Sequence, residues 1–209
     1  MPSLLAEKLH RLLLQDFSSG KLPPGLIINR RQIAADYNVS VTPVLEAMTM
    51  LEIEGFLETL PRKGTQIKPI TQQNITGNFI LRDAVESKAA RIYFGTKIKN
   101  SLDHLLKFAE KVNSASEDNL NDWKLEIAFH HELVALADCP VLIETYDRIM
   151  RLYLFHGMNQ LIPENFKIPR DDHVLLINNL LNAESANTAE KIIRDHVWYG
   201  KTYLLEGSI

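Results

Sequence analysis

Residues 29–56 read NRRQIAADYNVSVTPVLEAMTMLEIEGF, and the rest of the chain is arranged around this stretch. Asn29, followed three residues later by Gln32, has the form of a capping box, so a helix is expected to begin at the next residue. The segment 38–40, Asn-Val-Ser, breaks that helix, and Ser40 is placed to cap a second one. The pattern therefore predicts two helices joined by a tight turn.

The second helix carries an apolar stripe and is followed by a hairpin. Its apolar side chains recur at i, i+3, i+4 and i+7, namely Val44, Ala47, Met48 and Leu51. Gly55 is expected to end this helix, and two short strands, 56–60 and 65–70, follow it. The basic sequence Pro-Arg-Lys-Gly joins the strands. This order of elements predicts a winged helix-turn-helix domain over residues 1–70.

The remaining segments read as helices. An amphipathic helix is expected over 3–17, with an apolar face of leucines: Leu4, Leu5, Leu9, Leu12 and Leu13. After Thr71, which can cap a helix, no segment alternates convincingly with period two. Six helices are expected there, at 72–95, 98–113, 119–137, 140–158, 170–182 and 187–205. The predicted fold class is therefore mainly α, with an N-terminal winged helix-turn-helix domain (1–70) and a C-terminal all-α helical bundle (71–209).

Composition excludes several classes of protein. The chain has 209 residues, of which 45% are hydrophobic and 23% charged, as is ordinary for a globular protein. No apolar run approaches the length of about 18 residues that a membrane helix needs. The N-terminus carries charges within its apolar pattern, unlike a signal peptide. Cys139 is the single cysteine and cannot form an internal disulfide, which fits a reducing cytoplasm. We expect a cytoplasmic protein without a membrane partner.

The net charge of −3 is unusual for a protein that binds DNA. Residues 1–70 hold eight Lys and Arg against seven Asp and Glu, and the remainder holds fifteen against nineteen. Local basic clusters matter more for DNA affinity than the total charge does. Arg30-Arg31 and Arg62-Lys63 are two such clusters, and both are small. We therefore expect DNA binding with a modest dependence on salt.

Four residues of the helical part have a spacing that suits a metal site. Glu126 and His130 are four residues apart on one helix, so they share a face. His173 and His196 lie on two helices at nearly equal distances from a turn near residue 185, and an antiparallel hairpin would place them at the same height. One carboxylate and three imidazoles could then bind a divalent metal. Ordinary hydrogen-bonded histidines are the alternative interpretation of this spacing.

The chain resembles the GntR family of bacterial transcription regulators. Residues 19–25, Ser-Gly-Lys-Leu-Pro-Pro-Gly, are similar to its loop after the first helix, and residues 62–65 to its wing. Its helix-turn-helix pattern is matched by Val39-Ser40, Pro43-Val44, Glu46-Ala47, Leu51-Glu52 and Glu54-Gly55. The all-helical (FCD-type) effector domain of the FadR branch is matched by Leu81-Arg82, Val85-Glu86, Ala89-Ala90-Arg91, Phe129-His130 and residues 137–142.

The resemblance implies a metal centre and an effector site in the helical domain. Effector domains of this branch place an Asp and three His around a metal. His130, His173 and His196 match, and Glu126 stands where the Asp is usual. Zinc, nickel, manganese or iron would suit this set of ligands. An arginine of the first effector helix often faces the ligand, so Arg82 could clamp a small carboxylate. The alternative for this residue is an ordinary solvent-exposed arginine.

The expected DNA contacts depart from the family pattern at two positions. The predicted contacts are Arg30, Arg31, Ser40, Val41, Thr42, Leu45, Arg62, Lys63, Gly64 and Thr65. Val41 and Leu45 stand where the family usually carries arginines, each of which would supply about 1–3 kcal/mol of base discrimination. Three readings are open: apolar contacts with thymine methyls in an A·T-rich site, a larger share for Arg30, Arg31 and the wing, or weak DNA binding. We favour the first two together.

The sequence therefore predicts a metabolite-responsive transcription regulator rather than an enzyme. As a homodimer it would bind a two-fold double-stranded DNA operator, and a small carboxylate metabolite would relieve repression. One alternative is a metal-dependent hydrolase or oxygenase, although the chain offers no second acid–base pair or nucleophile. Another is a protein-interaction module whose winged domain has lost DNA binding and uses Val41 and Leu45 as an apolar patch.

Overall fold

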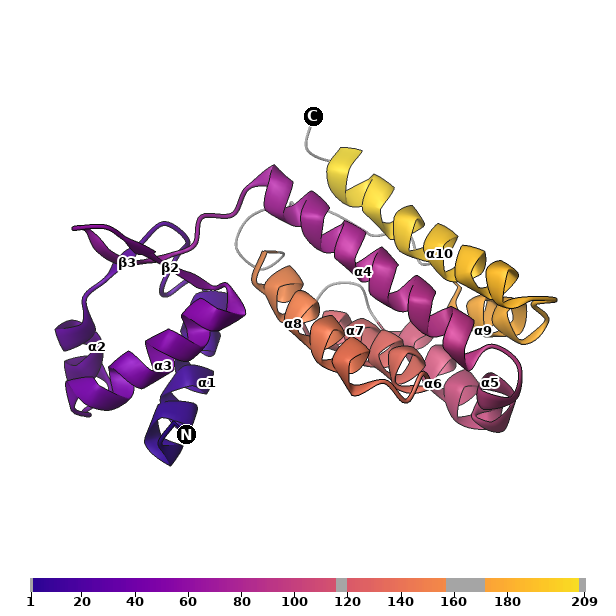
Figure 1. The fold of residues 1–209 in the computed structure, drawn as a ribbon, viewed down its shortest axis with the longest axis horizontal. Coiled ribbons are helices and arrows are strands. Elements are labelled where there is room, and N and C mark those ends of the chain that lie inside the picture. Colours follow the sequence, from indigo (N-terminus) through magenta and orange to yellow (C-terminus); the bar gives the residue numbers. More distant parts are fainter. Residues whose placement is uncertain (1, 116–119, 157–171, 207–209) are drawn as a thin grey trace. The chain divides into compact units, whose positions relative to one another are not determined.

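The computed structural model describes residues 2–115, 120–156 and 172–206, and the chain forms two compact units (Figure 1). The N-terminal unit contains the chain up to Asn74, and the helical unit begins at Ile75. This division falls four residues after the predicted boundary. None of the helices in the described ranges combines the length and the apolar character that a membrane span requires.

The N-terminal unit is a three-helix domain with a small antiparallel sheet. Its elements are α1 (Leu4–Ser18), β1 (Ile27–Ile28), α2 (Arg30–Asp36), α3 (Val41–Glu54), β2 (Leu57–Leu60) and β3 (Gly64–Ile67). The strand order is β1-β3-β2, and Ile28 pairs with Thr65. The sequence predicted the hairpin of β2 and β3 but not β1, because a strand of two residues shows no periodicity. The arrangement is a winged helix-turn-helix.

The core of this unit confirms the apolar stripe of α3 and corrects the predicted face of α1. Val44, Ala47, Met48 and Leu51 are all buried. The buried face of α1 consists of Ala6, Leu9, His10, Leu13 and Phe17. Leu4, by contrast, is 81% exposed, and Leu5 is also exposed, although Ala6 in the same turn of α1 is buried. Glu46 has a structural role: its carboxylate accepts hydrogen bonds from the backbone N–H and the hydroxyl of Ser3.

The helix caps confirm two sequence signals, Asn29 and Gly55, and correct two others. Asn29 caps α2, with its Oδ1 accepting from the N–H groups of Arg31 and Gln32 at 3.0 and 3.2 Å. The capping box is not closed, because the Gln32 amide donates to Asp36 instead of turning back to Asn29. Ser40 occupies the N-cap position of α3 but makes no side-chain cap hydrogen bond. Gly55 ends α3 with a φ of 91°, as predicted.

The helical unit contains seven helices within its described residues, one more than predicted. They are α4 (Gln72–Tyr93), α5 (Thr96–Asn100), α6 (Leu102–Ser114), α7 (Leu120–Ala135), α8 (Pro140–His156), α9 (His173–Leu181) and α10 (Ala186–Glu206). The predicted helix 98–113 is divided at Ser101, which ends α5 and precedes α6. Parts of the predicted helices 119–137, 140–158 and 170–182 lie outside the described residues.

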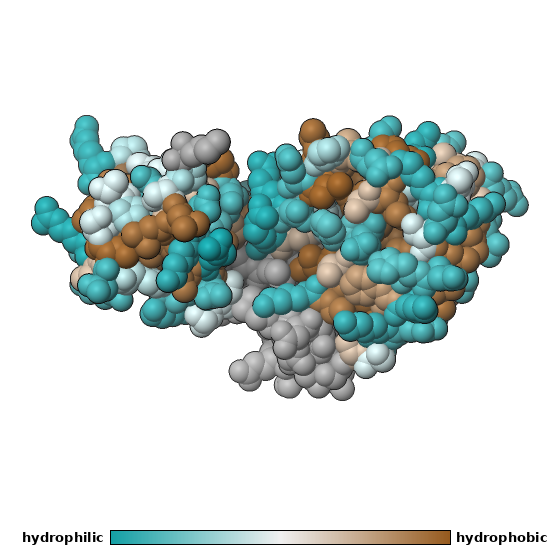
Figure 2. All heavy atoms as spheres, turned by 90° about the horizontal axis from the view of Figure 1, so that it is seen from below, coloured by the Kyte–Doolittle hydropathy of each residue, from teal (hydrophilic) through white to brown (hydrophobic). Residues whose placement is uncertain are grey.

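Helix α4 is linked by side chains to helices on two sides. The Trp198 indole of α10 donates to Asp83 of α4 at 2.9 Å. On the other side, Glu86 of α4 is 2.7 Å from His130 of α7. In Figure 1, α4 and α10 run alongside each other over much of their length. Helix α4 therefore brings groups from α7 and α10 into one region of the unit. Figure 2 shows apolar patches among hydrophilic side chains on the face it presents of each unit.

The different caps of α2 and α3 lead to a prediction on stability. Replacing Asn29 with Ala should lower the free energy of unfolding of the winged unit by about 1 kcal/mol, because two N–H groups lose their acceptor. Replacing Ser40 with Ala should change it by no more than about 0.5 kcal/mol, because no cap hydrogen bond is lost. Urea denaturation of both variants measures the difference. Equal destabilisation by the two substitutions would contradict it.

Candidate metal centre and DNA-facing surface

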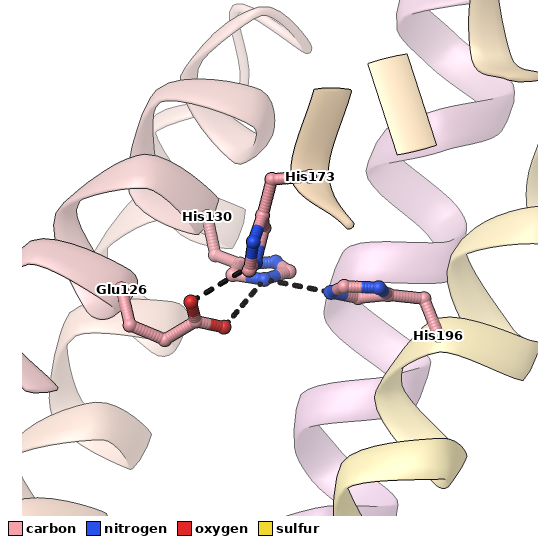
Figure 3. Close-up of side chains that lie close together, drawn as sticks. All are labelled: Glu126, His130, His173 and His196. Atoms are coloured by element: carbon pink, nitrogen blue, oxygen red, sulfur yellow. Dashed lines mark hydrogen bonds and ion pairs between the residues drawn. The ribbon is translucent and has the colours of Figure 1, made fainter. Parts of the chain in front are cut away.

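One carboxylate and three imidazoles converge inside the helical unit (Figure 3). Glu126 and His130 project from α7, His173 is the first residue of α9, and His196 comes from α10. One potential ligand atom from each residue lies within 4.8 Å of the others. The spacing argument predicted this convergence, because residues four apart share a helix face and the hairpin of α9 and α10 aligns the other two.

The cluster is tightly arranged and partly open to solvent. Glu126 Oε1 lies 3.1 Å from His130 Nε2, and Glu126 Oε2 lies 2.9 Å from His173 Nε2. His196 Nε2 is 3.1 Å from His130 Nε2. His130 and His173 are buried, whereas Glu126 and His196 are only partly buried. Among the four ligands, the exposed side-chain surface therefore belongs to Glu126 and His196.

The Nδ1 atom of each buried imidazole, on the side away from the cluster, contacts a hydrogen-bond acceptor. His130 Nδ1 is 2.7 Å from Glu86 Oε2, and His173 Nδ1 is 3.2 Å from Asn113 Oδ1. Because these partners accept hydrogen bonds, each Nδ1 carries a hydrogen and donates it. In the neutral tautomer each Nε2 then directs its lone pair toward the centre. Sequence analysis did not assign these supporting roles to Glu86 and Asn113.

Arg82 is buried, which excludes the reading of it as an ordinary surface arginine. Its side chain is 8% exposed, and its Nε donates to Glu86 Oε1 at 2.6 Å. Arg82 is thus connected to the centre through Glu86 and His130. The sequence signal for this pair was its spacing, because Arg82 and Glu86 are four residues apart on one predicted helix. Charged residues of this kind are rarely buried without a partner.

The charges of the cluster shift the pKa values of its members in opposite directions. Burial raises the pKa of Glu86, but the charges of Arg82 and His130 outweigh burial and lower it to about 2. Burial and the charge of Arg82 lower the pKa of His130, but the charge of Glu86 and the hydrogen bonds to Glu126 and Glu86 together raise it to about 9. Hydrogen bonds from His130 and His173 overcome burial and hold the pKa of Glu126 well below its usual range. Without a metal, the two carboxylates therefore keep a proton on His130.

The donor set fits a divalent metal ion. His173 Nε2 is buried, and its neighbour in the cluster is a Glu126 oxygen 2.9 Å away. His130 Nε2 and His196 Nε2 face each other, and at most one proton fits between them. Ligand atoms with metal bonds of about 2.1 Å stand about 3.0–3.4 Å apart in octahedral or tetrahedral geometry. The three separations of 2.9–3.1 Å between neighbouring ligand atoms are close to these values, and all four atoms lie within 4.8 Å of one another. Imidazole with carboxylate suits zinc, nickel, iron or manganese.

The raised pKa of His130 leads to a prediction on metal affinity. Metal binding needs the Nε2 lone pair and so releases the proton that His130 holds below a pH of about 9. Apparent zinc affinity should rise by about tenfold per pH unit between pH 6.5 and 8.5. The metal-free helical unit should lose stability over the same range, because the folded pKa lies above the unfolded value of 6.5. Competition titrations with a chromogenic chelator test this, and a flat profile would contradict it.

The outer face of α3 is exposed in the N-terminal unit, as a DNA-reading helix requires. Val41 and Leu45 are 38% and 39% exposed, and Thr42 also faces solvent. The other predicted contacts that are exposed are Arg30, Arg31, Ser40, Arg62, Lys63 and Gly64. Apolar side chains thus occupy the middle of this face, with basic residues on α2 and on the wing.

Thr65 is the exception among the predicted DNA contacts. It is 2% exposed, so its side chain is not presented to DNA. Its hydroxyl accepts a hydrogen bond from Arg30 Nη2 at 3.0 Å, which ties the start of α2 to the wing. The prediction of a direct contact is corrected to a supporting role. The cause is its position on β3, the central strand, where it lies opposite Ile28 and Thr59.

The wing turns through a conformation that glycine would adopt more easily. Lys63 N donates to Leu60 O at 3.1 Å, and Arg62, between them, has a φ of 63°. This combination, with Pro61 before Arg62, is that of a type II turn, which favours glycine at the position of Arg62. A left-handed conformation costs an ordinary residue roughly 1 kcal/mol or more. Arg62 therefore lowers the stability of the turn relative to glycine, but it presents a positive charge at the tip of the wing.

The strain at Arg62 separates stability from DNA binding. Replacing Arg62 with Gly should raise the free energy of unfolding of the winged unit by about 1 kcal/mol, because the turn loses its strain. The same change should weaken DNA binding and lower the slope of log affinity against log salt by about 1. Replacing Lys63 with Gly is the matched control, because Lys63 does not have a positive φ. Weaker folding of the Arg62 variant would contradict this account.

Comparisons with known proteins match both units. Residues 5–67 match the family model "Bacterial regulatory proteins, gntR family", and residues 79–198 match the FCD domain. The chain is 24% identical over 145 residues to the HTH-type transcriptional repressor RspR of Escherichia coli, which is 68% of this chain and 64% of RspR. It is also 24% identical over 200 residues to the repressor GlaR of Escherichia coli, which is 90% of each chain.

Solved structures share the fold. A GntR-type transcriptional regulator from Rhodococcus sp. RHA1 superposes with a TM-score of 0.67 over 98% of both chains, at 19% identity. McbR/YncC of Escherichia coli gives 0.65 over 99% of this chain and 100% of its own, at 16% identity. These likenesses show the fold alone.

A winged helix-turn-helix followed by a helical unit with a histidine-rich centre is the combination of domains that the two family models match. Since the FCD match covers more than half of the chain, the protein belongs to the GntR family in the group that carries an FCD domain.

Proposed function

We propose that this protein is a metabolite-responsive transcription repressor of the cytoplasm. In this proposal the winged unit binds a double-stranded DNA operator, and the helical unit binds a small carboxylate at a metal held by Glu126, His130, His173 and His196. The observation that carries the proposal is that one chain combines an exposed α3 face with a cluster of one carboxylate and three imidazoles, two of whose members are only partly buried. Repression is the proposed sign because relatives such as RspR and GlaR are named repressors.

The exposed face of α3 supports apolar readout of DNA. Val41 and Leu45 are exposed without being part of the core, and methyl groups of thymine are the apolar features of the major groove. Arg31 on α2 and Lys63 at the wing are exposed, which supports phosphate contacts that would fix the register. We propose that these groups together recognise a site with A·T-rich half-sites. A homodimer would bind two such half-sites related by a two-fold axis.

The accessible side of the cluster supports a carboxylate effector. Glu126 and His196 line this side, and a metal there would supply positive charge to an anion. Arg82 is proposed as part of the effector site, since its buried charge is joined to the centre through Glu86. The coupling between effector and DNA that such a regulator needs is only about 1–3 kcal/mol.

Selection from a random duplex library at low and moderate salt tests the DNA half of the proposal. We expect enrichment of a palindrome with A·T-rich half-sites. Against the selected site, Leu45→Ala should weaken binding by about fivefold through lost apolar contact, with little effect on random DNA. Lys63→Ala should weaken both equally and reduce the salt slope by about 1. Absence of enrichment at both salt concentrations would instead favour the protein-interaction module.

Titration of chelator-treated protein with zinc, nickel, manganese and iron(II) tests the metal half. We expect binding of at least one ion, and a loss of affinity of tenfold or more in His196→Ala. His104→Ala is the matched control, because His104 is an exposed histidine on α6 that pairs with Glu132 outside the cluster. Binding of none of the ions by the wild-type protein would contradict the metal centre.

A further inference from the structure

Helix α4 carries a buried ion pair, and its carboxylate contacts the Nδ1 of a histidine of the proposed metal centre. Arg82 and Glu86 are 8% and 2% exposed, and they lie one helical turn apart. Burying two charges is costly unless both are paired and hydrogen-bonded. Glu86 is paired on both of its oxygens: Oε1 is 2.6 Å from Arg82 Nε, and Oε2 is 2.7 Å from His130 Nδ1.

Both partners of Glu86 act as hydrogen-bond donors. The guanidinium of Arg82 has no acceptor and keeps its protons at any ordinary pH. His130 donates through Nδ1 whenever its Nε2 is to serve as a ligand. Glu86 must therefore accept at both oxygens, which a carboxylate does and an amide cannot do.

We propose that Glu86 is a positioning residue for the metal centre and that Arg82 orients it. Glu86 holds His130 in the tautomer that carries its hydrogen on Nδ1 and points the Nε2 lone pair at the metal position. Arg82 fixes Glu86 from the other side, so a buried charge on α4 supports a ligand on α7. This inference rests on the proposed metal centre and assigns to Glu86 a role that no ligand geometry alone implies.

The hydrogen bonds of Asn113 explain why the Nδ1 of His173 contacts an amide whereas the Nδ1 of His130 contacts a carboxylate. Asn113 Oδ1 accepts from both the backbone N–H and the Nδ1 of His173, while its Nδ2 donates to Asp172 Oδ1 at 2.8 Å. Its surroundings therefore offer donors to its oxygen and an acceptor to its nitrogen. Glu86 receives a hydrogen bond from a donor on each side, so both of its side-chain termini must be acceptor oxygens.

The substitution Glu86→Gln separates these roles. The single amide oxygen would turn to Arg82, which can only donate, and the amide nitrogen would then face His130 Nδ1. This arrangement selects the opposite tautomer, with a hydrogen on Nε2 in the metal position. We expect zinc affinity to fall by about 10- to 100-fold. Asp83→Asn is the matched control, because Asp83 is on the same helix but binds Trp198 and Arg194 on α10. It should leave zinc affinity unchanged.

A second substitution should partly restore binding. In Arg82→Met/Glu86→Gln the amide faces only one donor, so its oxygen can turn to His130 Nδ1 and recover the ligating tautomer. We expect the double variant to bind zinc about tenfold more tightly than Glu86→Gln. A purely structural role for the buried pair predicts the reverse, because removing both partners would add to the damage. If Glu86→Gln shows no cooperative unfolding transition, that variant is not folded and the double variant provides the test. The double variant should then bind zinc within about tenfold of the wild type.

The measurements are chelator competition for zinc affinity and ¹⁵N NMR of histidine-labelled, zinc-loaded protein. Wild type should show His130 protonated on Nδ1, and Glu86→Gln should show a hydrogen on Nε2. Wild-type zinc binding with unchanged affinity and tautomer in Glu86→Gln would overturn this inference and leave the proposed metal centre standing. A folded double variant that binds zinc no better than Glu86→Gln would overturn the role of Arg82. Absence of zinc binding by the wild type would overturn both.

Discussion

The buried carboxylate of Glu86 joins α4 to α7 within the helical unit. A charge in this position is stable only with opposite charge on more than one side, and Arg82 and His130 supply it at 2.6 and 2.7 Å. Meeting that requirement places α4 against α7 and fixes the plane of the His130 ring. Glu126 and the other two histidines then surround the Nε2 side of the same ring.

The winged unit shows a different balance between stability and function. Its core comes from the buried stripe of α3 and the inner face of α1, whose side chains are not exposed. The outer face of α3 is left to Val41 and Leu45, which contribute little to the core. At the wing, Arg62 occupies a left-handed conformation where glycine would be easier. Such strain is typical of functional positions, where the side chain matters more than the backbone.

Local patterns were predictable from the sequence, and tertiary partners were not. The α3 stripe and the Asn29 cap depend on residues three to seven apart, so the sequence shows them directly. His173 and His196 could be paired because a single hairpin relates them. Contacts between helices that are distant in the chain, such as that of Glu86 with His130, produce no regular spacing in the sequence from which they could be predicted.

Single residues also decided features that periodicity could not show. Ser101 divides one predicted helix into α5 and α6 without a glycine or proline to announce it. Thr65 looked like a wing contact by its place in the motif, but its strand is the central one and buries its side chain. Strand β1 is too short to have a pattern. These features follow from packing, which a single sequence does not display.

The central claim is that the metal centre communicates with DNA binding. Its most direct test is operator affinity, measured by fluorescence anisotropy, for zinc-loaded and chelator-treated protein in a panel of acetate, pyruvate, malate and citrate. The account predicts that at least one carboxylate lowers operator affinity by about 5- to 150-fold, and only in the zinc-loaded protein. An affinity that no carboxylate changes, or that changes equally in chelator-treated protein, would contradict it.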